Sequence, residues 1–169
     1  MFQKSVNRLQ AFGVAGELYA DKHTQTYVYT LNESSDNTMP TFGRAFTQTV
    51  GSVINNPTAG ATNPEQRVSA TMGGDDTFAG ILVFPKEHAL YGGLEASNTI
   101  PSGSEGSLCS FGQIVVKVAS AVQVGQAAGF IPETGEIVAK GTEGANDIPN
   151  SKFILVNSDN GGLAVLQLG

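Results

Sequence analysis

The sequence contains no tryptophan, a single cysteine and few charged residues. Charged residues make up 14% of the 169 positions, well below the quarter that is usual for globular domains. A lone cysteine cannot form an intrachain disulfide, and together with two histidines it cannot supply a zinc site of the Cys/His type. The low charge also argues against disorder driven by self-repulsion. We therefore expect a folded domain with a hydrophobic core, no bound metal and no cofactor.

Basic residues are scarce and scattered. Nine Lys and Arg stand against fifteen Asp and Glu, which gives a formal net charge of −6, and no two bases are adjacent. A duplex-binding surface needs clustered Lys and Arg, so a nucleic-acid partner is not expected. No apolar run approaches the roughly 20 residues of a membrane span, and Gln3, Asn7 and Gln10 interrupt what would be the apolar region of a signal peptide. The sequence thus predicts a soluble protein without a membrane partner.

Glycine, by contrast, is abundant, and short apolar runs alternate with turn residues. The 21 glycines recur with Pro, Asn and Asp between runs that carry β-branched and aromatic side chains, a pattern typical of strands. The predicted strands are residues 26–31, 43–50, 78–84, 112–118, 152–156 and 163–168. The sequence predicts a mainly β fold, an antiparallel barrel or sandwich of hairpins with an N-terminal arm and one long loop.

Two hairpins are predicted from turn chemistry. Asn-Ser-Asp-Asn-Gly-Gly at residues 157–162 separates the last two strands, and Pro-Glu-Thr-Gly at 132–135 suits a type I turn that ends in a left-handed residue. Residues 51–76 are too long and too rich in Gly, Pro and Asn for a plain connection. They form either a flexible functional loop or a stretch that holds a strand around residues 67–72.

The N-terminal segment has its own apolar spacing. Apolar residues recur at helical intervals in residues 1–10, which fits either a short amphipathic helix or an extended arm. We expect residues 1–16 to form this arm or helix and residues 17–169 to form a single β-rich domain. The candidate partner-binding residues are the apolar side chains of this segment: Phe2, Val6, Leu9 and Phe12.

No catalytic constellation is found. A nucleophilic Ser or Cys needs a base within hydrogen-bonding distance, and the only histidines are His23 and His88. Cys109 lies between Leu108 and Phe111 and is predicted to be a buried, inert thiol. We therefore predict that the protein is not an enzyme and has no catalytic residues.

The acidic pairs have simpler explanations than catalysis or metal binding. Glu133 and Glu136 belong to the predicted hairpin turn, where solvated carboxylates are the expected reading. Asp75 and Asp76 follow two glycines but lack the further oxygen ligands of a calcium loop. From the residues alone, the chain is a structural or binding module.

Several segments resemble the structural cement, or capsid decoration, proteins of tailed bacteriophages. Residues 78–93 (FAGILVFPKEHALYGG) resemble the family's strand, Pro-Lys and aromatic-Gly turn, and residues 42–47 (FGRAFT) its upstream strand. Residues 103–116 (GSEGSLCSFGQIVV) and the hairpins at 130–137 and 147–168 follow in the family's order. The resemblance is weakest in residues 1–10 and 51–76.

The resemblance implies a non-enzymatic virion protein, made in the cytoplasm of the bacterial host. Such a protein binds the outer surface of the assembled head and clamps neighbouring major capsid subunits, and a homo-oligomer is implied because these proteins occupy symmetry axes. Two alternatives remain open. One is a tail or baseplate structural protein. The other is a carbohydrate-binding module, for which the missing tryptophan would have to be replaced by Tyr19, Tyr27, Tyr29 and Tyr91.

Overall fold

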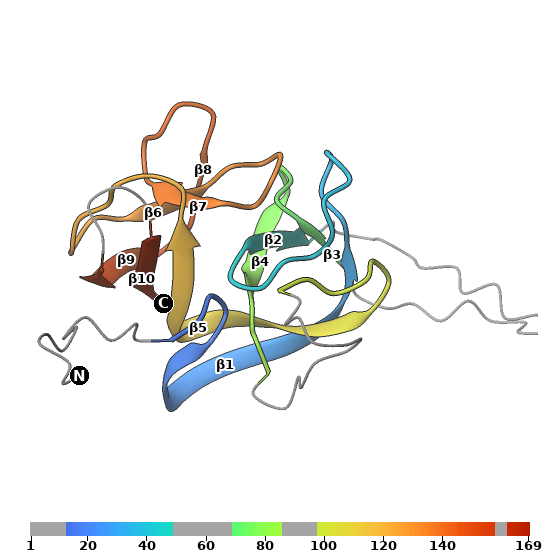
Figure 1. Cartoon of the computed structure of the whole chain (residues 1–169), viewed down its shortest axis with the longest axis horizontal. Helices are drawn as coiled ribbons and strands as arrows, with labels where there is room; N and C mark the ends of the chain where they lie inside the picture. The colour runs from blue at the N-terminus through green and yellow to red at the C-terminus, as the bar shows by residue number, and fades with distance from the viewer. Residues whose placement is uncertain (1–12, 49–68, 86–97, 158–161) are drawn as a thin grey trace, which may run out of the picture.

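The computed structural model describes residues 13–48, 69–85, 98–157 and 162–169, and in these residues every regular element is a strand (Figure 1). The predicted mainly β fold is therefore confirmed. The strands are β1 (Leu18–Asn32), β2 (Ala45–Gln48), β3 (Ser69–Met72), β4 (Thr77–Leu82), β5 (Glu105–Val118), β6 (Ala128–Phe130), β7 (Ile137–Ala139), β8 (Asn146–Asp147), β9 (Ser151–Val156) and β10 (Gly162–Leu168). Each of the six predicted runs overlaps one of them.

Five of the strands close into a barrel. Their order is β1-β3-β2-β4-β5, and β5 pairs again with β1. All of these pairs are antiparallel except β1 with β3, which is parallel. The barrel is therefore mixed, because the 20 residues between β2 and β3 are long enough for the crossover that parallel pairing needs. Strand β3 also confirms the second reading of residues 51–76, that the stretch holds a strand.

Strand β5 connects the barrel to the rest of the domain. Leu108 and Cys109 pair with β4, whereas the second half of β5, from Gly112 onward, pairs with β10 (Figure 1). Between these two halves of β5, residues 21–24 of β1 bulge opposite Gly112, and His23 adopts a positive φ of 62°. A Cβ on Gly112 would lie 2.8 Å from the Thr24 hydroxyl oxygen, so glycine lets the bulge close on β5.

Both predicted hairpins are present. Strands β9 and β10 pair antiparallel, with Leu168 opposite Ser151, and β6 pairs antiparallel with β7. The turn between β6 and β7 ends at Gly135, whose φ of 70° is the left-handed conformation predicted for it. Strand β8 pairs with β6, and these hairpins pack against the outer side of β2, β4 and β5.

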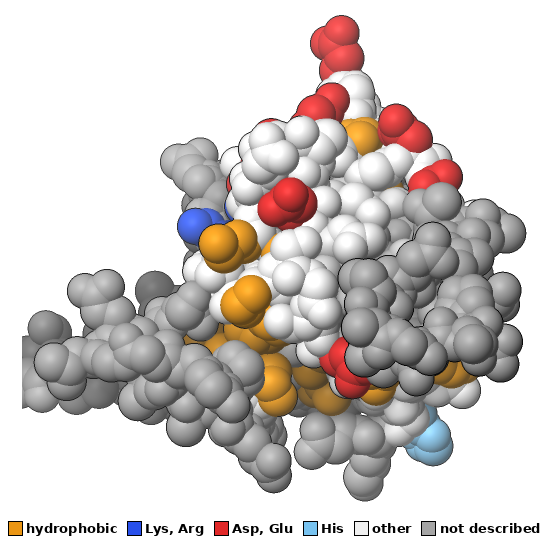
Figure 2. Space-filling view, turned by 90° about the vertical axis from the view of Figure 1, so that its right-hand side faces the viewer, with side chains coloured by type: hydrophobic (Ala, Val, Ile, Leu, Met, Phe, Trp, Pro, Cys, Tyr) orange, Lys and Arg blue, Asp and Glu red, His pale blue; other side chains and the backbone are white. Residues whose placement is uncertain are grey.

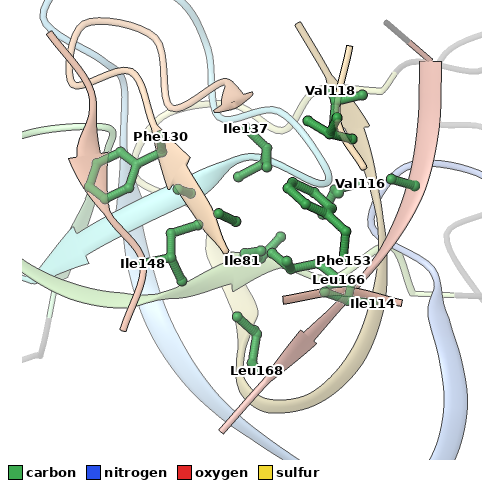
Figure 3. Packing of buried hydrophobic residues seen from close by; sticks show 14 of the residues in the cluster. Ile81, Ile114, Val116, Val118, Phe130, Ile137, Ile148, Phe153, Leu166 and Leu168 are labelled. Atoms are coloured by element: carbon green, nitrogen blue, oxygen red, sulfur yellow. The ribbon is translucent and has the colours of Figure 1, made fainter. Parts of the chain in front are cut away.

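The wall of the barrel separates two hydrophobic cores. Strands β2, β4 and β5 each point successive residues to opposite sides of this wall, because side chains alternate along a strand. The pairs, with the inner residue named first, are Phe46 and Ala45, Leu82 and Ile81, and Leu108 and Cys109. The barrel interior also holds Leu31 and Met72. Figure 3 shows the second core, where Phe153, Leu166, Ile114 and Val116 converge between the wall and the hairpins.

Candidate functional site

The candidate partner-binding residues predicted from the sequence, Phe2, Val6, Leu9 and Phe12, lie outside the described residues, as does His88. Their role therefore stays a prediction. His23 is exposed at the bulge of β1.

Cys109 is buried and inert, as predicted. Its side chain is fully buried, and its thiol donates to the carbonyl oxygen of Phe111 at 3.4 Å. Burial raises the pKa of the Cys109 thiol to about 11, since the thiolate loses its hydration inside the core. The thiolate, which is the nucleophilic form, is thus absent at neutral pH.

Three acidic residues, Glu136, Asp147 and Asp75, make structural contacts. Glu136 accepts from the Arg44 guanidinium at 3.0 Å, and Asp147 pairs with Lys140 at 2.8 Å. Asp75 accepts from the Asn146 amide at 3.0 Å, which ties the β3–β4 turn to β8. Among the residues that the structure describes, no group of three or more His, Cys, Asp or Glu could hold a metal ion. No helix in this part of the chain is long and apolar enough to cross a membrane.

The most distinctive surface is an open strand edge. We call the side of β1 away from β5, over residues 18–29, the β1 edge. Strand β3 covers this side only from Thr30 to Asn32, and no other described strand pairs with it. The N–H of Leu31 donates to Ser104 at 2.8 Å and its carbonyl accepts from Gly103 at 2.7 Å, so the backbone of Leu31 faces β5. By alternation, the N–H and C=O groups of Thr26 and Val28 face the open side.

The β1 edge also carries exposed apolar side chains. Exposure rises along one face of β1, from 0% at the core residue Leu31, through half-buried Tyr29, to 55% at Tyr27. On the opposite face Val28 is 63% exposed. Phe111, which is 43% exposed, pairs with Gln25 on the same face as Tyr27. The stripe of core residues thus continues out of the barrel into solvent.

Charge and apolar surface occupy different parts of the molecule. In Figure 2 most of the apolar side chains in view lie in the lower half, at the level of β1 in Figure 1, and most of the acidic ones lie in the upper half. We call the part of the molecule formed by the β3–β4 turn and by β6 to β8 with their connections the hairpin end. Its described acids are Asp75, Asp76, Glu133, Glu136, Glu143 and Asp147. The lower surface is therefore suited to apolar contact, and the hairpin end is anionic.

Sequence reasoning missed the β1 edge, although a signal was present. Residues 26–31 (TYVYTL) place apolar side chains on both faces of one strand. Such a run is expected for a strand buried on both sides. In the structure only its last residues are buried, and Tyr27 and Val28 are left exposed.

The described residues define an all-β domain with a buried thiol. A family model described as "Structural cement protein (E217 gp24/Pam3 gp6)" matches residues 2–169, so the chain belongs to the phage structural cement protein family. It is accordingly a structural protein of the phage capsid, and not an enzyme. The chain is also similar in fold to a chain from "The capsid of Myoviridae Phage XM1", with a TM-score of 0.65 and 16% identity over 99% of this chain and 97% of that one. No curated protein matches the sequence.

Proposed function

We propose that the protein binds the outer surface of the assembled phage head in many copies and clamps neighbouring major capsid subunits. The observation that carries this proposal is the family match over residues 2–169. The fold likeness to a phage capsid chain is compatible with it.

A clamp gains its strength from simultaneous contacts. Once one part of the protein is bound to a subunit, its second contact is intramolecular and benefits from a high effective concentration. The gain disappears when the geometry forbids both contacts together. The protein therefore binds expanded heads, whose subunits are correctly spaced, and binds free capsid subunits weakly.

The contacts to the shell are mainly apolar. Phe2, Val6, Leu9 and Phe12 supply anchors in the N-terminal segment. With 14% charged residues the chain has little material for an electrostatic interface, so binding depends only modestly on salt. A homo-oligomer is part of this proposal, because copies placed at a symmetry axis each reach a different capsid subunit.

Co-sedimentation with purified heads tests the proposal. The protein should saturate expanded heads of the cognate phage at low and at high salt, and should bind isolated capsid subunits much more weakly. Tail tubes and baseplates serve as the control for the alternative location. Undetectable binding to heads rejects the assignment, and equally tight binding to isolated subunits rejects the clamp.

A further inference from the structure

We propose that the β1 edge pairs with the β1 edge of a second copy of this chain, antiparallel about a two-fold axis at Tyr27. The proposal refines the homo-oligomer of the proposed function. It rests on the strand edge itself, and its mass and cross-linking measurements use no heads, so its failure and a failure of head binding can be told apart.

The two ends of the β1 edge fix the register. Beyond Tyr29 the open side is occupied, since Thr30 pairs with Ser69 of β3. Before Gln25 the strand is interrupted by the bulge at residues 21–24. A second irregularity, between Gln25 and Thr26, lies on β5, where Ser110 is the extra residue. Strand β1 itself therefore has no extra residue from Gln25 to Tyr29, no described strand pairs with its open side there, and Tyr27 is the centre of this stretch.

This register satisfies the exposed backbone groups. With the axis at Tyr27, Val28 lies opposite Thr26 of the partner subunit, and Thr26 lies opposite Val28 of the partner subunit. The groups of Thr26 and Val28 that face the open side then form the hydrogen bonds of an ordinary antiparallel ladder. Tyr27 lies across from the partner's Tyr27 in a non-hydrogen-bonded pair, the position where cross-strand side chains approach most closely.

The chemistry of the edge favours a second copy as its occupant. Two chains with a net charge of −6 each repel one another through most of their surfaces. Residues 24–31 contain no charged side chain, and most of the acids of the described loops lie at the hairpin end. An isologous contact places each patch against its own copy, so an uncharged strip is self-complementary.

The exposed side chains on both faces of β1 also favour pairing with a second copy. Strands that stay unpaired are usually protected by bulges or by Lys or Pro at the edge. Lys22 and the bulge lie at the N-terminal end of the β1 edge, whereas residues 25–31 contain neither Lys nor Pro. Tyr27 and Val28 are 55% and 63% exposed on opposite faces of β1. Pairing with a second β1 would cover both faces at once, with an aromatic pair on one of them.

Two matched valine substitutions test the contact. Val28 and Val124 are 63% and 65% exposed, and Val124 lies in the β5–β6 connection, away from β1. In sedimentation velocity the wild-type chain should have twice the 17.5 kDa mass of one chain. Val28→Lys should give a monomer, because the two lysines would lie diagonally across the paired edges on the same face and repel each other, whereas Val124→Lys should leave the dimer unchanged.

A cysteine substitution tests the register. Residues in a non-hydrogen-bonded antiparallel pair have Cα atoms about 4.5 Å apart, within the range of a disulfide. Tyr27→Cys should therefore form a disulfide-linked dimer on mild oxidation, while Val124→Cys should not, and native Cys109 is buried. The proposal is overturned by a wild-type chain that stays monomeric at high concentration, by a dimer that Val28→Lys does not dissociate, or by failure of Tyr27→Cys to cross-link. Loss of head binding in Val28→Lys with a monomeric wild type would assign the edge to a capsid strand.

Discussion

Arg44 holds Glu136 across the gap between the start of β2 and the β6–β7 turn. One guanidinium nitrogen lies 3.0 Å from the Glu136 carboxylate and the other donates to the Thr134 carbonyl at 2.7 Å. The two side chains are 24% and 42% exposed. The Arg44 side chain thus joins the β6–β7 turn to the start of β2. The two segments are far apart in the sequence, and no local sequence pattern predicts this contact.

The Arg44 contact should stabilise the fold more than an exposed ion pair does. Arg44→Ala should lower the free energy of unfolding by about 1–2 kcal/mol, because it removes a charge-assisted hydrogen bond and leaves a carbonyl without its donor. Lys140→Ala, which breaks the exposed pair with Asp147, should cost less than about 0.5 kcal/mol. Urea denaturation of the two variants measures the difference, and equal losses would contradict this account.

Gly73 should be intolerant of any side chain. Its φ is 70°, and a Cβ would lie 2.1 Å from the Pro132 carbonyl oxygen, which already accepts from the N–H of Gly74. Gly73→Ala should therefore destabilise by about 1 kcal/mol for the left-handed backbone and by about 1–3 kcal/mol more for the clash.

Gly141 provides the matched control for that substitution. It has a φ of 84° but no atom within 4 Å of a Cβ. Gly141→Ala should show only the backbone term of about 1 kcal/mol. Thermal or urea unfolding of the two variants separates the cost of the left-handed backbone from the cost of the clash. If Gly73→Ala is as stable as Gly141→Ala, the β6–β7 turn can move away from the new methyl group and the clash has no cost.

Cys109 should make stability decrease in alkali. Because burial raises its pKa to about 11, the unfolded chain releases the thiol proton before the folded chain does. The free energy of unfolding should thus fall between about pH 9 and pH 11, by at most about 1.4 kcal/mol per pH unit from this group. Cys109→Ala should lose this component, in addition to a cavity cost of about 1 kcal/mol or more at all pH values. Identical alkaline slopes in the two proteins would be evidence against the buried thiol.

The N-terminal anchors should affect binding and leave stability unchanged. Replacing Phe2, Val6, Leu9 and Phe12 together by Ala should weaken binding to expanded heads, while the urea midpoint stays that of the wild type. Met39→Ala, a truncation of a side chain that is 53% exposed on another loop, serves as the control. The amides of residues 1–10 should also gain hydrogen-exchange protection when the protein binds heads. Unchanged head affinity in the fourfold variant would remove these residues from the interface.

Much of the fold follows from local sequence signals. Residues 152–156 and 163–168 form a hairpin because β-branched and apolar runs flank a turn rich in Asn, Asp and Gly. Gly135 adopts a positive φ because the Pro-Glu-Thr-Gly turn requires it. These features need only neighbouring residues, so the sequence predicts them.

Non-local pairing accounts for what the sequence does not predict. Strand β3 joins the barrel through three parallel pairs with β1, and its four residues carry no strong strand signal of their own. Strand β5 begins at Glu105, before the predicted residues 112–118, since Glu105 to Cys109 pair with β1 and Leu108 and Cys109 also pair with β4. The exposure of Tyr27 depends equally on where the pairing of β1 with β3 begins, at Thr30, and only the closed barrel determines that point.

The resistance of the heads themselves tests the central claim most directly. Expanded heads that lack the protein should be titrated with the purified chain, and the temperature at which they release their DNA should be measured at each occupancy. A clamp across neighbouring subunits predicts that this temperature rises as sites fill and that it returns to the baseline when binding is lost. Heads that carry the protein at full occupancy and still break at the temperature of bare heads would contradict the clamp.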